Sequence, residues 1–290
     1  MKDKGLNTFQ MKWIALILMV IDHIGAILFP DVLLFRWIGR LSAPLFLFCL
    51  VHGLDYTKNR KAYLLRLYGF AVGTELLWIL CDVCGLSIQH HDNIFGMLFV
   101  VAAVICIIKR FSWYVSAGIL ILWQALSIGI ILPLDFVSGI PETVQYLAIT
   151  ATGNASLCDY GPLWVVMGVL MYYWKDNKKR LAIGYSGCCI VLWVLSVTAI
   201  FARVALWMEH YVPVLSGVAH FSCVLLTGTN AIETMMGRDG LYFGDYQWMM
   251  IFSLPLMLLY NGKKGKSWKY FFYVFYPVHL VLLTVLAQVL

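Results

Sequence analysis

Long apolar runs separated by short polar and basic segments dominate the pattern of this chain. An α-helix of roughly 17–25 mostly apolar residues is long enough to cross a hydrocarbon layer about 30 Å thick. We predict nine such helices, at Trp13–Phe29, Trp37–Tyr56, Leu67–Leu86, Ile94–Ile108, Phe111–Leu134, Cys158–Trp174, Leu181–Ala202, Tyr246–Tyr260 and Tyr270–Leu290. The pattern therefore predicts an all-α, polytopic integral membrane bundle of about nine transmembrane helices (8–10), with residues 1–290 in a single transmembrane domain.

Two segments between these helices are longer than simple connectors. Asp135–Leu157 and Arg203–Asp245 are expected to be the longest non-helical pieces, and each is a candidate lid or site wall. Within the second, Tyr211–Leu226 is apolar but contains a proline, a glycine and His220. Three interpretations stay open for it: a tenth span, a re-entrant hairpin and an interfacial helix.

The basic residues predict how the helices are oriented. If the N-terminus lies in the cytoplasm and nine helices alternate, most of the 21 lysines and arginines fall on the cytoplasmic side. The other side keeps only Arg36, Arg40, Arg203 and Arg238, and no lysine. Since cytoplasmic loops of membrane proteins are enriched in Lys and Arg, we predict an N-in, C-out topology.

The composition excludes several classes of protein. The chain is 62% hydrophobic and 12% charged, whereas soluble domains are nearer ~45–50% apolar and ~25% charged. A soluble enzyme, a nucleic-acid-binding protein and a disordered protein do not fit these values. The eight cysteines form no evident disulfide framework, and Cys81 and Cys84 lack the second pair that a zinc site needs.

Asp22 and His23 are the clearest polar residues inside a predicted span. They lie eleven residues beyond Lys12, about 16 Å along a helix and so near mid-membrane. Ionisable residues inside a span cost at least ~2.5 kcal/mol, and they tend to face a cavity. Because adjacent residues are ~100° apart on a helix, we expect one to face a cavity while the other pairs with a neighbouring helix. A satisfied packing pair is the alternative.

Arg36 and Arg40 follow where the chain re-enters the membrane. Their i, i+4 spacing places both guanidinium groups on one helix face. Arginine binds phosphate or carboxylate groups in bidentate fashion. The two residues are therefore candidates for binding a substrate, and snorkelling to the outer headgroups is the alternative.

Further polar residues are weaker candidates for the same site. Glu75 lies mid-span, and His279 follows a proline inside the last predicted helix, where a broken helix could line a cavity. The run His90, His91, Asp92 and Asn93 resembles a set of metal ligands, but consecutive side chains point apart on regular structure. We therefore predict no metal site.

Two basic loops form a positive cytoplasmic rim. They contain Lys58, Arg60, Lys61 and Arg66 in one loop, and Lys263, Lys264, Lys266 and Lys269 in the other. This rim could bind anionic lipid headgroups, bind the phosphates of a cytosolic cofactor, or serve only to set topology.

Several segments together resemble the TraX family, which is known for pilin acetylation in conjugation. They are MKWIALILMVIDHIGAILFP, RWIGRLSAPLFLFCLVHGLDYTKNRKAYLLRL, HDNIFGML, DYGPLWVVMGVL and LLYNGKKGKSWKYFFYVFYPVHLVLL. The resemblance covers nearly the whole chain, and the combination of DHIGA, RxxGRxxxPLF and YNGKKG…FYxFYPxHL is specific. The first three spans also look, more distantly, like those of transmembrane acyltransferases that acylate sugars.

The resemblance implies a membrane N-acetyltransferase that uses cytosolic acetyl-CoA on an acceptor amine. The acceptor would be a peptide or pilin N-terminus, or an amino-sugar-like group, and the protein would sit in the bacterial cytoplasmic membrane. His23 best matches the intramembrane catalytic histidine, with Asp22 beside it. Arg36, Arg40, Asn93, His279 and Glu75 are then candidates to orient the acceptor or polarise the carbonyl. Lys58, Arg60, Lys61, Arg66, Lys263 and Lys264 would hold CoA.

One position departs from the family pattern, and two other functions remain as alternatives. His52 precedes Gly53 where a glutamate is expected, which leaves any role for a carboxylate there in doubt. A proton-coupled transporter or flippase would use the same buried ionisable residues as a path, although no repeated halves are evident. A non-catalytic assembly factor would need no such residues. The expected partners are membrane lipids, acetyl-CoA and an amine, with no nucleic acid.

Overall fold

The structure is a computed structural model that describes residues 5–86, 93–135, 137, 139–157, 161–198, 200–213 and 246–289. The described residues form α-helices joined by turns, with one 3-10 helix, and this confirms the predicted all-α class. The elements are α1 (Thr8–Ile27), α2 (Leu33–Gly39), α3 (Ser42–Tyr56), α4 (Arg60–Val83), α5 (Ile94–Arg110), α6 (Trp113–Asp135), α7 (Glu142–Thr152), α8 (Gly161–Trp174), α9 (Lys178–Thr198), α10 (Ile200–Tyr211), η2 (Gln247–Ser253), α13 (Leu254–Leu258) and α14 (Lys269–Val289).

Five of the helical stretches in the described part of the chain are long and apolar enough to cross a membrane. They are Thr8–Ile27, Leu33–Tyr56, Arg60–Val83, Trp113–Leu134 and Tyr270–Val289. A multi-pass helical protein is therefore supported, whereas the total of nine spans and the N-in, C-out topology stay predictions.

Prolines explain where the observed helices differ from the predicted spans. The predicted span Trp37–Tyr56 is divided at Arg40 and Leu41, since Pro44 has no N–H to donate to the carbonyl four residues earlier. The predicted span Tyr246–Tyr260 is a 3-10 helix followed by a short α-helix that begins beside Pro255.

The prediction of two long non-helical segments is wrong where the structure describes them. α7 lies inside Asp135–Leu157, and α10 continues to Tyr211, inside Arg203–Asp245. The start and end of α7 carry recognisable features, a proline before Glu142 and a left-handed Gly153 after Thr152. Apolar run length alone does not reveal such a short, mixed helix. Most of Tyr211–Leu226, including His220, lies outside the described residues.

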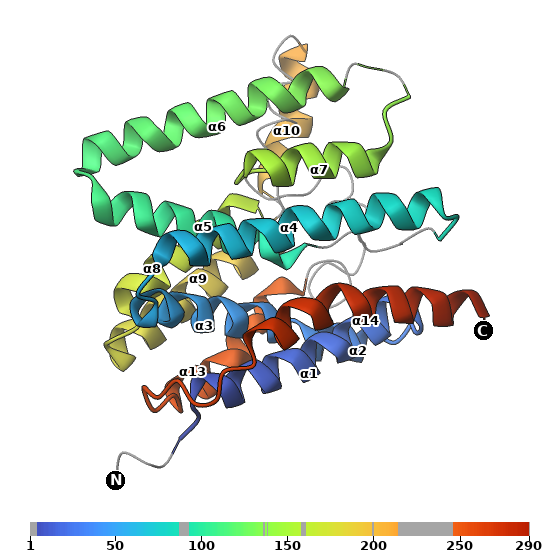
Figure 1. Ribbon diagram of the computed structural model, residues 1–290. Coiled ribbons are helices and arrows are strands. Elements are labelled where there is room, and N and C mark those ends of the chain that lie inside the picture. Colours follow the sequence, from blue (N-terminus) through green and yellow to red (C-terminus); the bar gives the residue numbers. More distant parts are fainter. Residues whose placement is uncertain are drawn as a thin grey trace.

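The long helices run roughly alongside one another in layers (Figure 1). α1 and α14 lie side by side along one face, α6 covers the opposite face, and α4 and α5 lie between them. The start of α1 and the end of α14 lie at opposite ends of the bundle (Figure 1). Because α1 and α14 lie side by side, the first and last of the described helices are neighbours.

The outer surface of the bundle is apolar, as a lipid-facing surface requires. On α6, Ile121, Leu122, Leu126 and Ile130 are all exposed. A soluble monomer rarely exposes so large a contiguous apolar patch. Hydrocarbon contact removes the cost of that exposure.

The basic segments gather at one end of the bundle. Lys175 pairs with Asp55 at 2.8 Å, which ties the end of α8 to the end of α3, and Lys178 donates to the Leu258 carbonyl at 2.6 Å. Burial lowers the pKa of Lys175, but the hydrogen bonds and charges of Asp55 and Asp176 outweigh it, so that pKa is raised overall. Which side of a membrane this end faces stays a prediction.

The N-terminal segment is fastened to the loop before α14 at this same end. Leu6 donates to the Leu259 carbonyl and accepts from the Asn261 N–H, each at 2.9 Å. α1 then begins with a capping box, in which Asn7 and Gln10 satisfy each other's backbone N–H groups. Backbone hydrogen bonds thus join the segment before α1 to the loop before α14.

Close helix packing in the interior generates a stability prediction at Gly168 on α8. A Cβ there would lie 2.6 Å from Val101 and 3.1 Å from Leu47, both fully buried. We expect Gly168→Leu to destabilise the protein by about 1–3 kcal/mol through overpacking, measured as a lower thermal midpoint in detergent.

The matched control is Gly187→Leu on α9, where a Cβ meets nothing within 4 Å. That change should leave the midpoint unchanged or raise it, since leucine is the better helix former. Equal midpoints for the two variants would contradict the packing described for α8.

Candidate active site

One face of α1 carries the residues that lead to the candidate site. Lys12, Leu16, Met19 and His23 follow the i, i+4, i+7, i+11 spacing, which places their side chains in a row along one side of a helix. Each of them lines one or more of three internal cavities.

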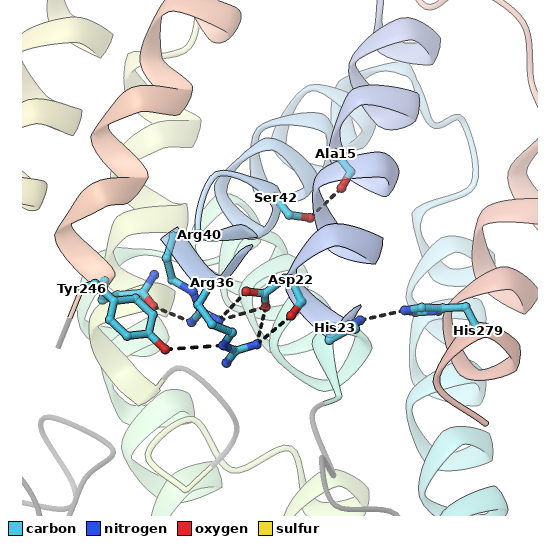
Figure 2. Close-up of polar contacts among 9 residues, drawn as sticks. Ala15, Asp22, His23, Arg36, Arg40, Ser42, Tyr246 and His279 are labelled. Atoms are coloured by element: carbon cyan, nitrogen blue, oxygen red, sulfur yellow. Dashed lines mark hydrogen bonds and ion pairs between the residues drawn. The ribbon is translucent and has the colours of Figure 1, made fainter. Parts of the chain in front are cut away.

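Asp22, next to His23, is bound by two arginines from the following helix turns. Its Oδ2 lies 2.9 Å from Arg36 Nη1 and 2.9 Å from Arg40 Nη2, and Arg40 also reaches Oδ1 at 3.1 Å. Arg36 donates further to Tyr246 and Arg40 to Gln247. Figure 2 shows this cluster on one side of α1. With two cations for one carboxylate, it keeps a net positive charge.

Glycines allow this close approach of α2 to α1. A Cβ at Gly39 would lie 2.2 Å from the side chain of Asp22, and one at Gly25 would lie 2.4 Å from Phe35. Ser42, at the start of α3, donates to the Ala15 carbonyl at 2.7 Å. Small residues that let helices approach closely are typical of membrane helix packing.

His23 points away from Asp22, toward α14 (Figure 2). Its Nδ1 lies 2.7 Å from His279 Nε2, and His279 Nδ1 lies 3.0 Å from the Phe275 carbonyl oxygen. The two histidines are 4% and 6% exposed. The site therefore joins a histidine on the first helix to a histidine on the last.

If both rings are neutral, the hydrogen bonds fit one pair of tautomers. A carbonyl oxygen only accepts, so His279 Nδ1 carries a proton and donates to Phe275. His279 Nε2 is then the acceptor, and His23 Nδ1 donates to it. Nε2 is left as the unprotonated, basic nitrogen of His23.

Three cavities follow one another along α1. The basic cavity includes Lys12, Arg66, Lys264 and Lys266 in its lining. The apolar cavity shares Lys12, Tyr63, Phe272 and Tyr273 with the basic cavity, and it shares Met19, Ile94 and Tyr276 with the histidine cavity. The histidine cavity is lined by Asp22, His23, Arg40 and Gln247, among others. The three cavities are therefore neighbours, in a row from the basic end of the bundle to His23.

Glu75 and Asn93 form a separate polar cluster behind this row. Glu75 is 2% exposed, and its Oε1 accepts from Asn93 Nδ2 at 2.6 Å and from Thr150 on α7 at 3.0 Å. Its Oε2 has no hydrogen-bond partner among the described residues. Neither Glu75 nor Asn93 lines the histidine cavity, and Asn93 caps the start of α5.

The structure divides the six residues predicted to hold CoA. Arg66 and Lys264 line the basic cavity, whereas Lys61 lines a separate groove between α4 and α5. The linings of the three cavities along α1 do not include Lys58, Arg60 or Lys263.

Sequence reasoning missed residues that the structure brings to the cavities. Sequence reasoning used Lys12 only to judge the depth of His23, and it placed Lys266 in the basic rim without naming it as a residue that holds CoA. It did not single out Tyr276, Tyr246 or Gln247. The spacing from Lys12 to His23 could have revealed Lys12, because it places both on one face of α1. Nothing in the sequence shows that Tyr246 and Gln247 reach Arg36 and Arg40.

Some predicted polar residues lie outside the described residues, namely His90, His91 and Asp92. Within the described ranges, no three His, Cys, Asp or Glu side chains gather closely enough to hold a metal ion.

Fold and site together define a helical protein whose long apolar helices enclose a buried histidine pair and an arginine–aspartate cluster. A model of the TraX protein family matches residues 8–287, so the chain belongs to the TraX family. The chain is also 25% identical to a probable fimbrial assembly protein, FimC of serogroup H1, from Dichelobacter nodosus, over 97% of this chain and 96% of that protein. No solved structure matches the chain.

The arginine–aspartate cluster generates a stability prediction. Asp22→Asn leaves two half-buried arginines with no carboxylate, whereas Arg36→Gln leaves Asp22 paired with Arg40. Uncompensated buried charge costs about 3–5 kcal/mol in other proteins. We therefore expect Asp22→Asn to lower the thermal midpoint in detergent clearly more than Arg36→Gln.

The control is Asp31→Asn, which changes an exposed aspartate in the turn between α1 and α2. Its midpoint should equal that of the wild type. If Asp22→Asn were no more damaging than Arg36→Gln, the cluster would not be a charge-compensating unit.

Proposed function

We propose that the protein is a membrane-embedded N-acetyltransferase of the bacterial cytoplasmic membrane. It moves an acetyl group from cytosolic acetyl-CoA to an acceptor amine, which is a peptide or pilin N-terminus or an amino-sugar-like group. The TraX family is associated with pilin acetylation, and its model covers almost the whole chain. The row of cavities from the basic end to His23 is the observation that carries the proposal.

The chemical groups of acetyl-CoA match the order of the three cavities along α1. Its phosphates are anionic and suit the basic cavity, where Lys12, Lys264 and Lys266 supply positive charge. Its pantetheine arm is thin and uncharged, and it suits the apolar cavity beyond. From Lys12 to His23 is about 16 Å along the helix. The thioester would then lie beside His23.

His23 acts as the general base in this proposal. The acceptor nitrogen attacks the thioester carbonyl carbon, and His23 Nε2 takes the proton that the amine loses. The tetrahedral intermediate then breaks its C–S bond, and His23 returns the proton to the departing CoA sulfur. The products are the acetylated amine and free CoA, so atoms and charge balance.

The remaining site residues hold or polarise the reacting groups. His279 acts through His23, since its Nε2 accepts the hydrogen bond from His23 Nδ1–H and so leaves His23 Nε2 as the basic nitrogen. The net positive charge around Arg40 would stabilise the oxyanion of the intermediate. Asp22 holds Arg36 and Arg40, and it is a positioning residue in this scheme. Glu75 and Asn93 support the start of α5, whose Ile94 lines the histidine cavity.

The first test is acetyl-CoA binding and turnover by detergent-purified protein, with His23→Ala beside the wild type. Loss of a general base typically costs 10²–10⁴-fold in rate. We expect the variant to bind acetyl-CoA within about threefold of the wild type and to lose at least ~10²-fold in acetyl transfer or slow hydrolysis.

The matched control is His52→Ala. His52 is a buried histidine on α3 that lines none of the three cavities. The His52→Ala variant should retain wild-type activity. If wild-type protein fails to bind acetyl-CoA, the acetyltransferase proposal is wrong, and transport through the same buried residues becomes the function to test.

A second test concerns His279. His279→Gln keeps an acceptor near the position of Nε2, whereas His279→Leu removes it. Loss of the group that orients a catalytic histidine costs up to ~10⁴ in other enzymes. We expect His279→Leu to lower kcat by roughly 10²-fold or more with KM for acetyl-CoA unchanged, and His279→Gln to recover part of the loss.

A purely structural role for His279 would give a different pattern. Both variants would then lose activity in proportion to folded protein, and kcat per folded molecule would be unchanged. Circular dichroism and size-exclusion profiles separate that outcome from the expected one.

A further inference from the structure

A groove on the outer surface of the bundle lies between α4 and α14. Its lining includes Arg66 at one end, then Gly69 and Gly73 on α4, and Val274 and Pro277 on α14. The groove is open to the outside and has a volume of about 380 Å³. Phe70 and Tyr273 stack at 4.7 Å where the two helices meet.

The glycines keep this groove open. A Cβ at Gly69 or at Gly73 would meet nothing within 4 Å. Val274 is 50% exposed, so the groove opens outward rather than into the core. Its walls are largely apolar, and in a membrane an opening of this kind faces lipid.

Arg66 gives the groove a charged end. The residue lies six positions after the start of α4, about 9 Å from that end of the helix and near headgroup depth. Its guanidinium group lies 5.6 Å from the Tyr63 ring and 5.9 Å from the Tyr273 ring. In the part of the chain that the structure describes, Arg66 forms no ion pair, and its Nε is buried without a hydrogen-bond partner. Its guanidinium group is hydrogen-bonded to the hydroxyls of Tyr273 and Tyr270, which are neutral, so the positive charge has no anion beside it.

We propose that this groove binds one phospholipid with an anionic headgroup. The phosphate would sit against Arg66, because guanidinium binds phosphate with charge-assisted hydrogen bonds. One acyl chain would lie over Gly69 and Gly73 toward Pro277, a path of about 10 Å from Arg66 to Gly73. The inference rests on the membrane location in the proposed function, and it does not depend on acetyl transfer.

The competing occupants differ in chemistry. Acetyl-CoA also carries phosphates, but it has no long chain to fill an apolar, outward-facing groove. A second copy of this protein could pack against the small-residue face of α4, since glycines four residues apart favour close helix contact. Arg66 argues against that occupant, because packing a second helix there would bury its charge without an anion.

The experiment is native mass spectrometry of detergent-purified protein mixed with phosphatidylglycerol or with phosphatidylcholine of the same acyl chains. No acetyl-CoA is present, so failure here is distinct from failure of the proposed enzyme. We expect the wild type to retain phosphatidylglycerol at least fivefold more than phosphatidylcholine. Added inorganic phosphate should not displace the lipid.

Two variants test the two halves of the groove. Arg66→Gln should reduce retention of phosphatidylglycerol to the level of phosphatidylcholine. Gly73→Leu fills the path of the chain and should lower retention of both lipids. Because a Cβ at Gly73 meets nothing within 4 Å, Gly73→Leu should fold, and a thermal midpoint at or above that of the wild type checks this.

The matched control is Gly118→Leu on α6, another glycine whose Cβ meets nothing within 4 Å and which does not line the groove. It should retain lipid like the wild type. Equal retention of the two lipids by the wild type, or undiminished retention by Gly73→Leu, would overturn the proposal. A wild-type dimer that Gly73→Leu abolishes would assign the groove to a second copy instead.

Discussion

The rest of the site depends on the ion pairs that Arg36 and Arg40 form with the Asp22 carboxylate. Charged groups in an apolar bundle are costly unless they are paired. Here the pairing also orients α1, since Asp22 turned toward α2 forces its neighbour His23 toward α14 (Figure 2). The ion cluster thus fixes the direction of the histidine without touching it.

The second constraint is the continuous face of α1. The same helix presents a lysine near its start, apolar residues in its middle and a histidine near its end, and the three cavities follow that order. A single helix face can therefore present three environments in order: a positive charge, an apolar stretch and an imidazole ring. The other walls come largely from α3, α4, α5 and α14.

Much of the fold could be predicted from the chain because run length and charge are local properties. The apolar runs gave the class and most of the long helices, and the i, i+4 spacing placed Arg36 and Arg40 on one face. The breaks near Pro44 and Pro255 and the short helix α7 depend on local backbone chemistry that run length does not record. The partnership of His23 with His279, and of Glu75 with Thr150, depends on which helices touch, and no spacing along the chain encodes that.

The separation of the paired residues has a consequence for how the protein is made. Asp22 meets its arginines 14 and 18 residues later, whereas His23 meets His279 only after 256 residues. At synthesis rates of about 5–20 residues per second, the charge cluster can close tens of seconds before the histidine pair. The carboxylate of Asp22 can therefore be paired early in synthesis. The ring of His23 gains its hydrogen-bond partner only when the last helix has been made. A chain whose translation stops before the last helix still carries both partners of the charge cluster but lacks the partner of His23.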